Sequence, residues 1–151
     1  MATQVEYDTT HWPLAVLVLP ADVSDMDLPR LARSLDAIYA RRVRFVSITD
    51  ATAVSKLPDA KARGEIGAWT KSIEAQSKRY LVANALVVPG AVARGVLTAI
   101  QWIAPPVVPT TVCATVHEGA AYVIEHARAS AIEVGGVERF LASQRPRARS
   151  A

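Results

Sequence analysis

The run Leu14-Ala15-Val16-Leu17-Val18-Leu19 is the stretch of this sequence that says most about its fold. Six consecutive apolar residues match the length of a β-strand, and the lack of alternation with polar residues predicts a strand buried on both faces. Such strands are typical of sheets that carry helices on both sides. The run therefore predicts an α/β fold with this strand inside it.

The residues before this strand predict a short N-terminal hairpin. Residues 5–8 have a strand pattern, and the segment Thr9-Thr10-His11-Trp12-Pro13 has the composition of a turn. We therefore expect residues 5–8 to add one antiparallel strand at the edge of the sheet.

Helix and strand patterns alternate through the rest of the chain. Short apolar runs predict strands at residues 45–49, 85–88 and 108–114. Apolar spacing predicts helices from a cap at Asp25 or Asp27 to about residue 42, and over residues 58–78, 90–104 and 116–128. This order predicts a single, mostly parallel (mixed) sheet of about five strands, with an N-terminal hairpin and four helices.

Two of these helices carry local signals that can be checked. Thr115-Val116-His117-Glu118 is a capping box, in which the Thr115 hydroxyl accepts from the Glu118 amide and the Glu118 carboxylate returns to the Thr115 amide. In the helix at residues 58–78, Gly64 and Gly67 each cost about 1 kcal/mol relative to Ala. These glycines either permit close packing or loosen the first half of that helix.

One domain over residues 1–135 and a short C-terminal segment with a basic, flexible tail over 136–151 account for the length. A segment near residues 137–141 is predicted to dock back as one turn. The formal net charge is +3, and Arg145, Arg147 and Arg149 in the tail supply three positive charges, so the rest of the chain is neutral. Without interleaved aromatic residues these arginines do not indicate specific nucleic-acid binding.

We expect a cytoplasmic protein. The N-terminus lacks a basic region followed by an apolar core, so no secretory signal is expected. The apolar stretch at residues 81–109 is interrupted by prolines and polar residues, so no membrane span is expected. The single cysteine, Cys113, lies in a strand pattern and is expected to be a buried apolar side chain.

The sequence lacks the constellations of common catalytic and metal sites. His117 and His126 lie nine residues apart on one helix and do not converge on a metal. Asp50 stands alone at a strand end and no lysine follows Lys78, which argues against a receiver-like phosphoryl-transfer site. No glycine-rich phosphate loop is present. We therefore expect no enzymatic activity, no metal and no cofactor.

Two stretches carry a family resemblance. Residues 112–123 are Val-Cys-Ala-Thr-Val-His-Glu-Gly-Ala-Ala-Tyr-Val, and residues 86–97 are Leu-Val-Val-Pro-Gly-Ala-Val-Ala-Arg-Gly-Val-Leu. The first resembles the pattern x-F-x-T-x-E-E-A-x-x-W-L of a divergent group of STAS domains, the family typified by anti-sigma-factor antagonists. The second is similar to the fourth strand and third helix of that group. The resemblance covers about residues 5–130 and implies a non-enzymatic regulatory module that binds a protein.

The loop after Asp50 is where the resemblance has functional content. In phosphorylated members of that family, a kinase modifies a serine at the helix start that follows such a loop. Here Asp50, Thr52 and Ser55 keep the character of the loop, but Pro58-Asp59-Ala60-Lys61 replaces the phosphoacceptor stretch and offers no hydroxyl. Asp59 is predicted to be a helix-starting residue, with a built-in phosphate mimic as the alternative. Phosphorylation of Thr52 or Ser55 stays open.

The helix at residues 90–104 is apolar on nearly all sides and has Arg94 as its one charge. The helical spacing predicts that Leu97, Gln101 and Trp102 face away from the sheet, which would make them a protein-contact or dimer surface unless the C-terminal segment covers them. We predict a regulatory module that binds a protein partner or a second copy of itself through the loop 50–59 and this helix, using Asp50, Thr52, Ser55, Asp59, Arg94, Leu97 and Trp102. A small-molecule or lipid carrier and a structural homo-oligomer subunit remain alternatives.

Overall fold

A parallel sheet of four strands forms the centre of the computed structural model, which describes residues 4–91, 93, 94 and 106–144. The strands are adjacent in chain order: β1 (Leu14–Val18), β2 (Phe45–Asp50), β3 (Leu81–Val87) and β4 (Thr110–Cys113). All three neighbouring pairs run parallel. The predicted α/β class is confirmed, but the described residues form four strands in place of about five.

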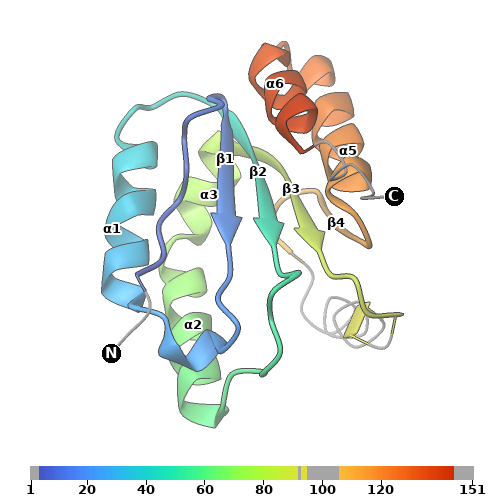
Figure 1. The fold of residues 1–151 in the computed structure, drawn as a ribbon. Helices are drawn as coiled ribbons and strands as arrows, with labels where there is room; N and C mark the ends of the chain where they lie inside the picture. The colour runs from blue at the N-terminus through green and yellow to red at the C-terminus, as the bar shows by residue number, and fades with distance from the viewer. Residues whose placement is uncertain (1–3, 92, 95–105, 145–151) are drawn as a thin grey trace, which may run out of the picture.

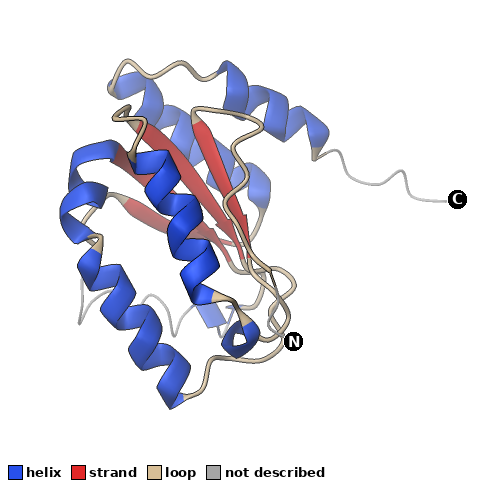
Figure 2. Ribbon diagram, turned by 90° about the vertical axis from the view of Figure 1, so that its left-hand side faces the viewer, coloured by secondary structure: helices blue, strands red, loops and turns tan. Residues whose placement is uncertain are grey.

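Helices cover both faces of this sheet (Figure 1). One face carries α1 (Leu28–Tyr39), α2 (Ala60–Ser72) and α3 (Glu74–Tyr80). The other carries α5 (Val116–Ala129) and α6 (Gly135–Ser143). Figure 2 shows the sheet between these two helical layers. A short 3-10 helix, η1 (Val23–Asp25), follows β1.

The strand β1 is buried on both faces, as its unbroken apolar run predicted. Leu14 and Val16 belong to the core under α5 and α6. Ala15 and Leu17 belong to the clusters under α1, where they meet Leu35 and Leu31 respectively. Side chains of this strand are therefore buried on both faces of the sheet, where they contribute to the cores under both helical layers.

The predicted N-terminal hairpin is wrong in its first strand. Of residues 5–8, Asp8 alone pairs with β1, in one antiparallel bridge to Val16 with N···O distances of 2.7 and 2.9 Å. The preceding residues turn toward α1: the Tyr7 amide donates to Ser34 Oγ at 3.2 Å, and Val5 packs with Leu31. Residues 5–7 therefore pack against α1 and do not form the row of backbone hydrogen bonds that a second strand would have made with β1.

The predicted helix over residues 58–78 is two helices. Ile73, with φ −100° and ψ 3°, leaves the helical conformation and separates α2 from α3. The next strand begins at Leu81, earlier than the predicted residue 85, because Phe45 at the start of β2 already pairs with Leu81. The stretch Leu81-Val82-Ala83 is apolar throughout, and periodicity does not separate a strand from a helix end there.

The last two helices complete the core. In α5 the Thr115 hydroxyl accepts from the Glu118 amide at 3.2 Å as predicted, but Glu118 Oε2 accepts from the Ala114 amide at 3.3 Å and not from Thr115. The C-terminal turn predicted near residues 137–141 is the longer helix α6, whose Val137 and Phe140 are buried beside α5.

Within the described residues, no helix has the length and apolar character needed to cross a membrane.

Candidate functional site

The candidate site lies where the four parallel strands end. In open α/β sheets, binding sites form outside the carboxyl ends of the strands, because the loops that follow them meet there. Here β2 ends at Asp50 and leads into the loop 51–59. The loop that follows β1 lies against this loop, and the turn that follows β3 is next to it.

Asp50 shapes the start of the loop. Its Oδ1 accepts a hydrogen bond from the Thr52 amide at 2.9 Å, which closes a tight side-chain turn. Its backbone carbonyl accepts from the Leu19 amide at 2.9 Å, and the Ala51 amide donates to the Val87 carbonyl at the same distance. The backbone of Asp50 and Ala51 therefore joins this loop to the chain after β1 and to the end of β3, and one carboxylate oxygen of Asp50 is occupied by the Thr52 amide.

The loop 51–59 is fastened along its length to the residues that follow β1. The amides of Ser55 and Lys56 both donate to the Ala21 carbonyl, at 2.9 and 3.0 Å. Lys56 Nζ lies 3.5 Å from Asp22 Oδ2, an exposed pair of small energetic weight. Five or six residues after Asp50 the chain is thus held by backbone hydrogen bonds, which gives an exposed loop a defined conformation.

Asp59 begins α2. Its Oδ1 accepts from the Ala62 amide at 2.8 Å, which is the geometry of a helix N-cap, and its own amide donates to Ser24 Oγ at 3.0 Å. The prediction that Asp59 is a helix-starting residue is confirmed. Thr52 and Ser55 are exposed on the same loop, and Ser55 Oγ makes one long contact, 3.4 Å, to the Ala21 carbonyl.

Leu57 is the residue of this loop that sequence reasoning missed. Its relative exposure is 72%, the highest among the large apolar side chains of the described residues. It stands between Lys56 and Pro58, so neither helical nor strand periodicity marks it. Its position inside a predicted interaction loop is the one signal that pointed toward it.

Arg94 lies seven residues after Val87, the last residue of the neighbouring strand β3. Its Nη1 donates to the carbonyl oxygens of Val88 and Pro89, at 2.9 and 2.7 Å, and so holds the turn after the strand. Most of the predicted helix 90–104, with Leu97 and Trp102, lies outside the described residues. The structure thus places Asp50, Thr52, Ser55 and Asp59 along one segment, and the Arg94 side chain contacts the turn after the adjacent strand β3.

Cys113 ends β4 at this edge and is buried, as predicted. Burial raises the pKa of its thiol, and the nearby Glu118 carboxylate raises it further, against smaller lowering effects of the Thr115 backbone and Arg94. A thiol with a raised pKa is a poor nucleophile at neutral pH. In the part of the chain that the structure describes, no three His, Cys, Asp or Glu side chains come together as metal ligands.

Comparison with known proteins gives no assignment: no family model, no curated protein and no solved structure matches this chain.

Proposed function

We propose that this chain is a non-enzymatic regulatory module that binds a protein partner through the loop 51–59, with Leu57 at the centre of the contact. The observation that carries the proposal is the 72% exposure of Leu57. Its loop is already held in place by hydrogen bonds to the residues that follow β1. A preformed loop loses little conformational freedom when it binds, so more of the contact energy appears as affinity.

The chemistry of the partner follows from the side chains around Leu57. Lys56 and Asp59 are exposed on either side of it, so the partner presents an apolar depression with an acidic and a basic group at its rim. Burying a leucine contributes about 1.5–3 kcal/mol, which corresponds to about tenfold in affinity or more. Leu57 is therefore the expected hot spot, and the two charges act mainly on specificity.

The non-enzymatic part of the proposal rests on how the polar side chains are used. The carboxylates of Asp50 and Asp59 each accept a backbone amide, and Arg94 donates to two backbone carbonyls. These groups shape loops, which suits a binding surface. The regulatory role comes from the resemblance of residues 86–97 and 112–123 to STAS domains, and it is proposed on that basis.

A photocrosslinking experiment tests the contact. A benzophenone amino acid is placed at position 57, and in a control protein at position 43, where Val43 is 49% exposed at the opposite edge of the sheet. We expect position 57 to yield one defined adduct in the native cells, with a second protein or with another copy of this chain, and position 43 not to yield it.

The affinity of the crosslinked partner is then measured for the wild type, Leu57→Ala and Val43→Ala. We expect Leu57→Ala to weaken binding by about tenfold or more and Val43→Ala to leave it unchanged. The same adducts from both positions, or equal affinities for all three proteins, would overturn the proposal.

A further inference from the structure

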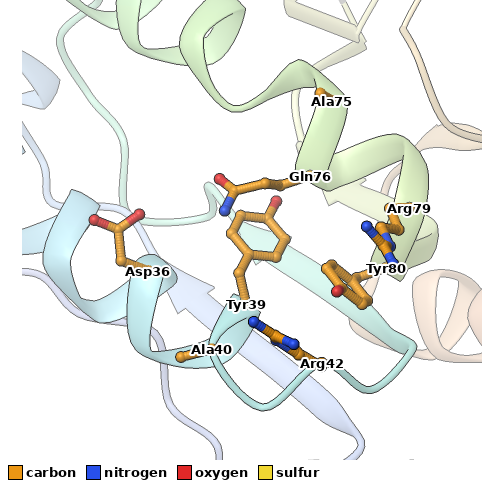
Figure 3. A pocket seen from close by; sticks show the side chains of 8 residues that line it. All are labelled: Asp36, Tyr39, Ala40, Arg42, Ala75, Gln76, Arg79 and Tyr80. Carbon is orange, nitrogen blue, oxygen red and sulfur yellow. The ribbon is translucent and has the colours of Figure 1, made fainter.

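The opposite edge of the sheet, where the strands begin, carries a hollow of about 520 Å³ between the ends of α1 and α3 (Figure 3). Its polar and aromatic lining includes Asp36, Tyr39, Arg42, Gln76, Arg79 and Tyr80. The volume lies within the usual range for small-molecule sites, about 300–1,000 Å³. None of these residues belongs to the loop 51–59, so the hollow is independent of the proposed protein contact.

The floor of the hollow is rigid. Tyr39 is buried, and its hydroxyl lies 2.8 Å from Ser77 Oγ, which ties α1 to α3. The rings of Tyr39 and Tyr80 are 6.2 Å apart between centroids. Tyr80 is partly exposed and turns its ring toward the open space. The hollow therefore combines a fixed base with an accessible aromatic surface.

Arg42 differs from the other arginines of its turn. Arg41 lies over the Trp12 ring at 4.2 Å, and Arg44 Nη2 donates to the Ser130 carbonyl at 2.7 Å. The Arg42 guanidinium makes no hydrogen bond or ion pair with the described residues and lines the hollow. Arg41 and Arg44 therefore have structural contacts, whereas the N–H donors of Arg42 are available to bind a ligand in the hollow.

The backbone at Arg42 is in the left-handed region, with φ 53°. Glycine or asparagine favours this conformation at the end of a helix, and other residues are strained there. The Arg42 amide donates to the Tyr39 carbonyl at 3.0 Å, which closes the turn in this conformation. Arginine is unfavourable in this left-handed conformation, and here its side chain lines a hollow. This combination suggests that the side chain has a function.

Arg79 supplies a second cation to the same space. Its guanidinium carbon lies 5.5 Å from the centroid of the Tyr80 ring, and the side chain is exposed. In Figure 3, Arg42 and Arg79 lie on the two sides of Tyr80, while Asp36 lies beyond Tyr39, away from both. The positive charge is thus concentrated at one end of the hollow, next to the exposed ring.

We propose that this end of the hollow binds a phosphate group, either free phosphate or the phosphate of a small ester, between Arg42 and Arg79. Guanidinium groups offer planar pairs of N–H donors that match phosphate oxygens, and Arg42 and Arg79 both line the hollow, so they can present such donors to one anion from two sides. Tyr80 provides a surface on which the organic part of an ester rests. Asp36 faces the other end, where it does not meet the phosphate.

Isothermal titration at low ionic strength, with inorganic phosphate and with phenyl phosphate, tests the site. Four proteins are compared: wild type, Arg42→Gly, Arg79→Gln and Arg33→Ala. Arg33 is an exposed arginine of α1 that does not line the hollow, so its variant controls for the loss of one positive charge. Arg42→Gly suits the left-handed backbone, so the turn is expected to persist.

We expect the wild type to bind at least one of the two probes, and Arg42→Gly and Arg79→Gln each to weaken that binding by about tenfold or more. Arg33→Ala is expected to bind as the wild type does. Tighter binding of phenyl phosphate would identify an ester as the ligand, and equal binding of the two probes would identify phosphate itself. No binding of either probe at millimolar concentration, or an equal loss in Arg33→Ala, would overturn the proposal.

Discussion

The hydroxyl oxygens of Tyr39 and Ser77 lie 2.8 Å apart in the interior, so a single hydrogen bond joins α1 to α3. Tyr39 is 4% exposed and Ser77 is 7% exposed, which leaves little water to replace this bond. The Tyr39 ring also meets Phe45 of β2 edge-on, at 5.9 Å between centroids. The pair therefore fixes the distance between two helices on the same face of the sheet and forms the base of the hollow beside Arg42.

The hydroxyl groups of Tyr39 and Ser77 should be energetically coupled. Losing one of them should lower the free energy of unfolding by more than half of the decrease caused by losing both. Ser77→Ala and Tyr39→Phe are each expected to lower the free energy of unfolding by about 1–2 kcal/mol, because each leaves a buried hydroxyl without a partner. The double variant leaves none, so its loss should be smaller than the sum by about 1 kcal/mol. Urea denaturation of the four proteins measures this coupling. Strict additivity would show that the two hydroxyls do not interact.

Replacing Gly64 or Gly67 in α2 by alanine should stabilise the protein. Apart from the adjacent residues and the nearby backbone of its own helix, an added Cβ at either glycine would meet no atom within 4 Å, so neither glycine serves close packing. Each substitution by alanine is expected to raise the free energy of unfolding by about 1 kcal/mol, from helix propensity alone. Thermal and urea denaturation check this. Unchanged stability in both variants would mean that this part of α2 contributes little to the folded state.

Replacing Gly136 in α6 by alanine should have the opposite effect on stability, because this glycine is closely packed. A Cβ there would fall 2.6 Å from the Trp12 carbonyl oxygen and closer still to that of His11, both of them backbone atoms. Gly136→Ala is therefore expected to lower the free energy of unfolding by about 1–3 kcal/mol, although alanine is the better helix former. A stabilised Gly136→Ala variant would contradict the close packing of α6 against the turn before β1.

The sequence was most informative where a pattern is local. The apolar run at 14–19 predicted a strand buried on both faces, and the spacing of Leu31, Leu35 and Ile38 predicted the buried face of α1. The break at Ile73 was missed because its residue type and spacing continue the apolar stripe of α2. Residues 5–8 failed as a strand because contacts with α1, distant in sequence, outweigh local strand propensity.

Both candidate sites depend on information that local patterns do not hold. Loop 51–59 was selected through its position after a strand, but the exposure of Leu57 follows from how the loop is tied to Ala21. The hollow joins residues 36–42 to residues 75–80 across the sheet face. From the sequence, Arg42 was indistinguishable from Arg41, since both suit the negative end of a helix dipole. Their backbone conformations and contacts separate them.

Alkaline pH should destabilise the fold through groups that stay protonated in it. Burial raises the pKa of the Tyr7 phenol above its ordinary 10.0, and burial raises the pKa of the Cys113 thiol above its ordinary 9.0. The unfolded chain therefore releases these protons at lower pH than the folded chain does. The free energy of unfolding is expected to fall as the pH rises past about 9 and more steeply past about 10.

Tyr7→Phe should make the steep part of this dependence shallower, since the phenol with the raised pKa is absent. Urea denaturation of Tyr7→Phe and wild type at intervals between pH 7 and pH 11 measures both slopes. Parallel curves above pH 10 would contradict the assignment of this effect to Tyr7.

Arg42 should be a residue whose loss helps the fold and harms the phosphate site. Its backbone is left-handed, with φ 53°, and its guanidinium has no hydrogen bond or ion pair within the described residues. Arg42→Gly is expected to raise the free energy of unfolding by about 1 kcal/mol, because glycine adopts this conformation without strain. Arg42→Ala removes the same charge but keeps the strain, so its stability should stay close to that of the wild type.

The two variants together separate structure from binding. Both should lose affinity for phosphate, because both lack the guanidinium, yet only the glycine variant should gain stability in urea denaturation. If both variants were instead less stable than the wild type, the Arg42 side chain would be supporting the turn. Its unfavourable backbone would then need no explanation from a ligand.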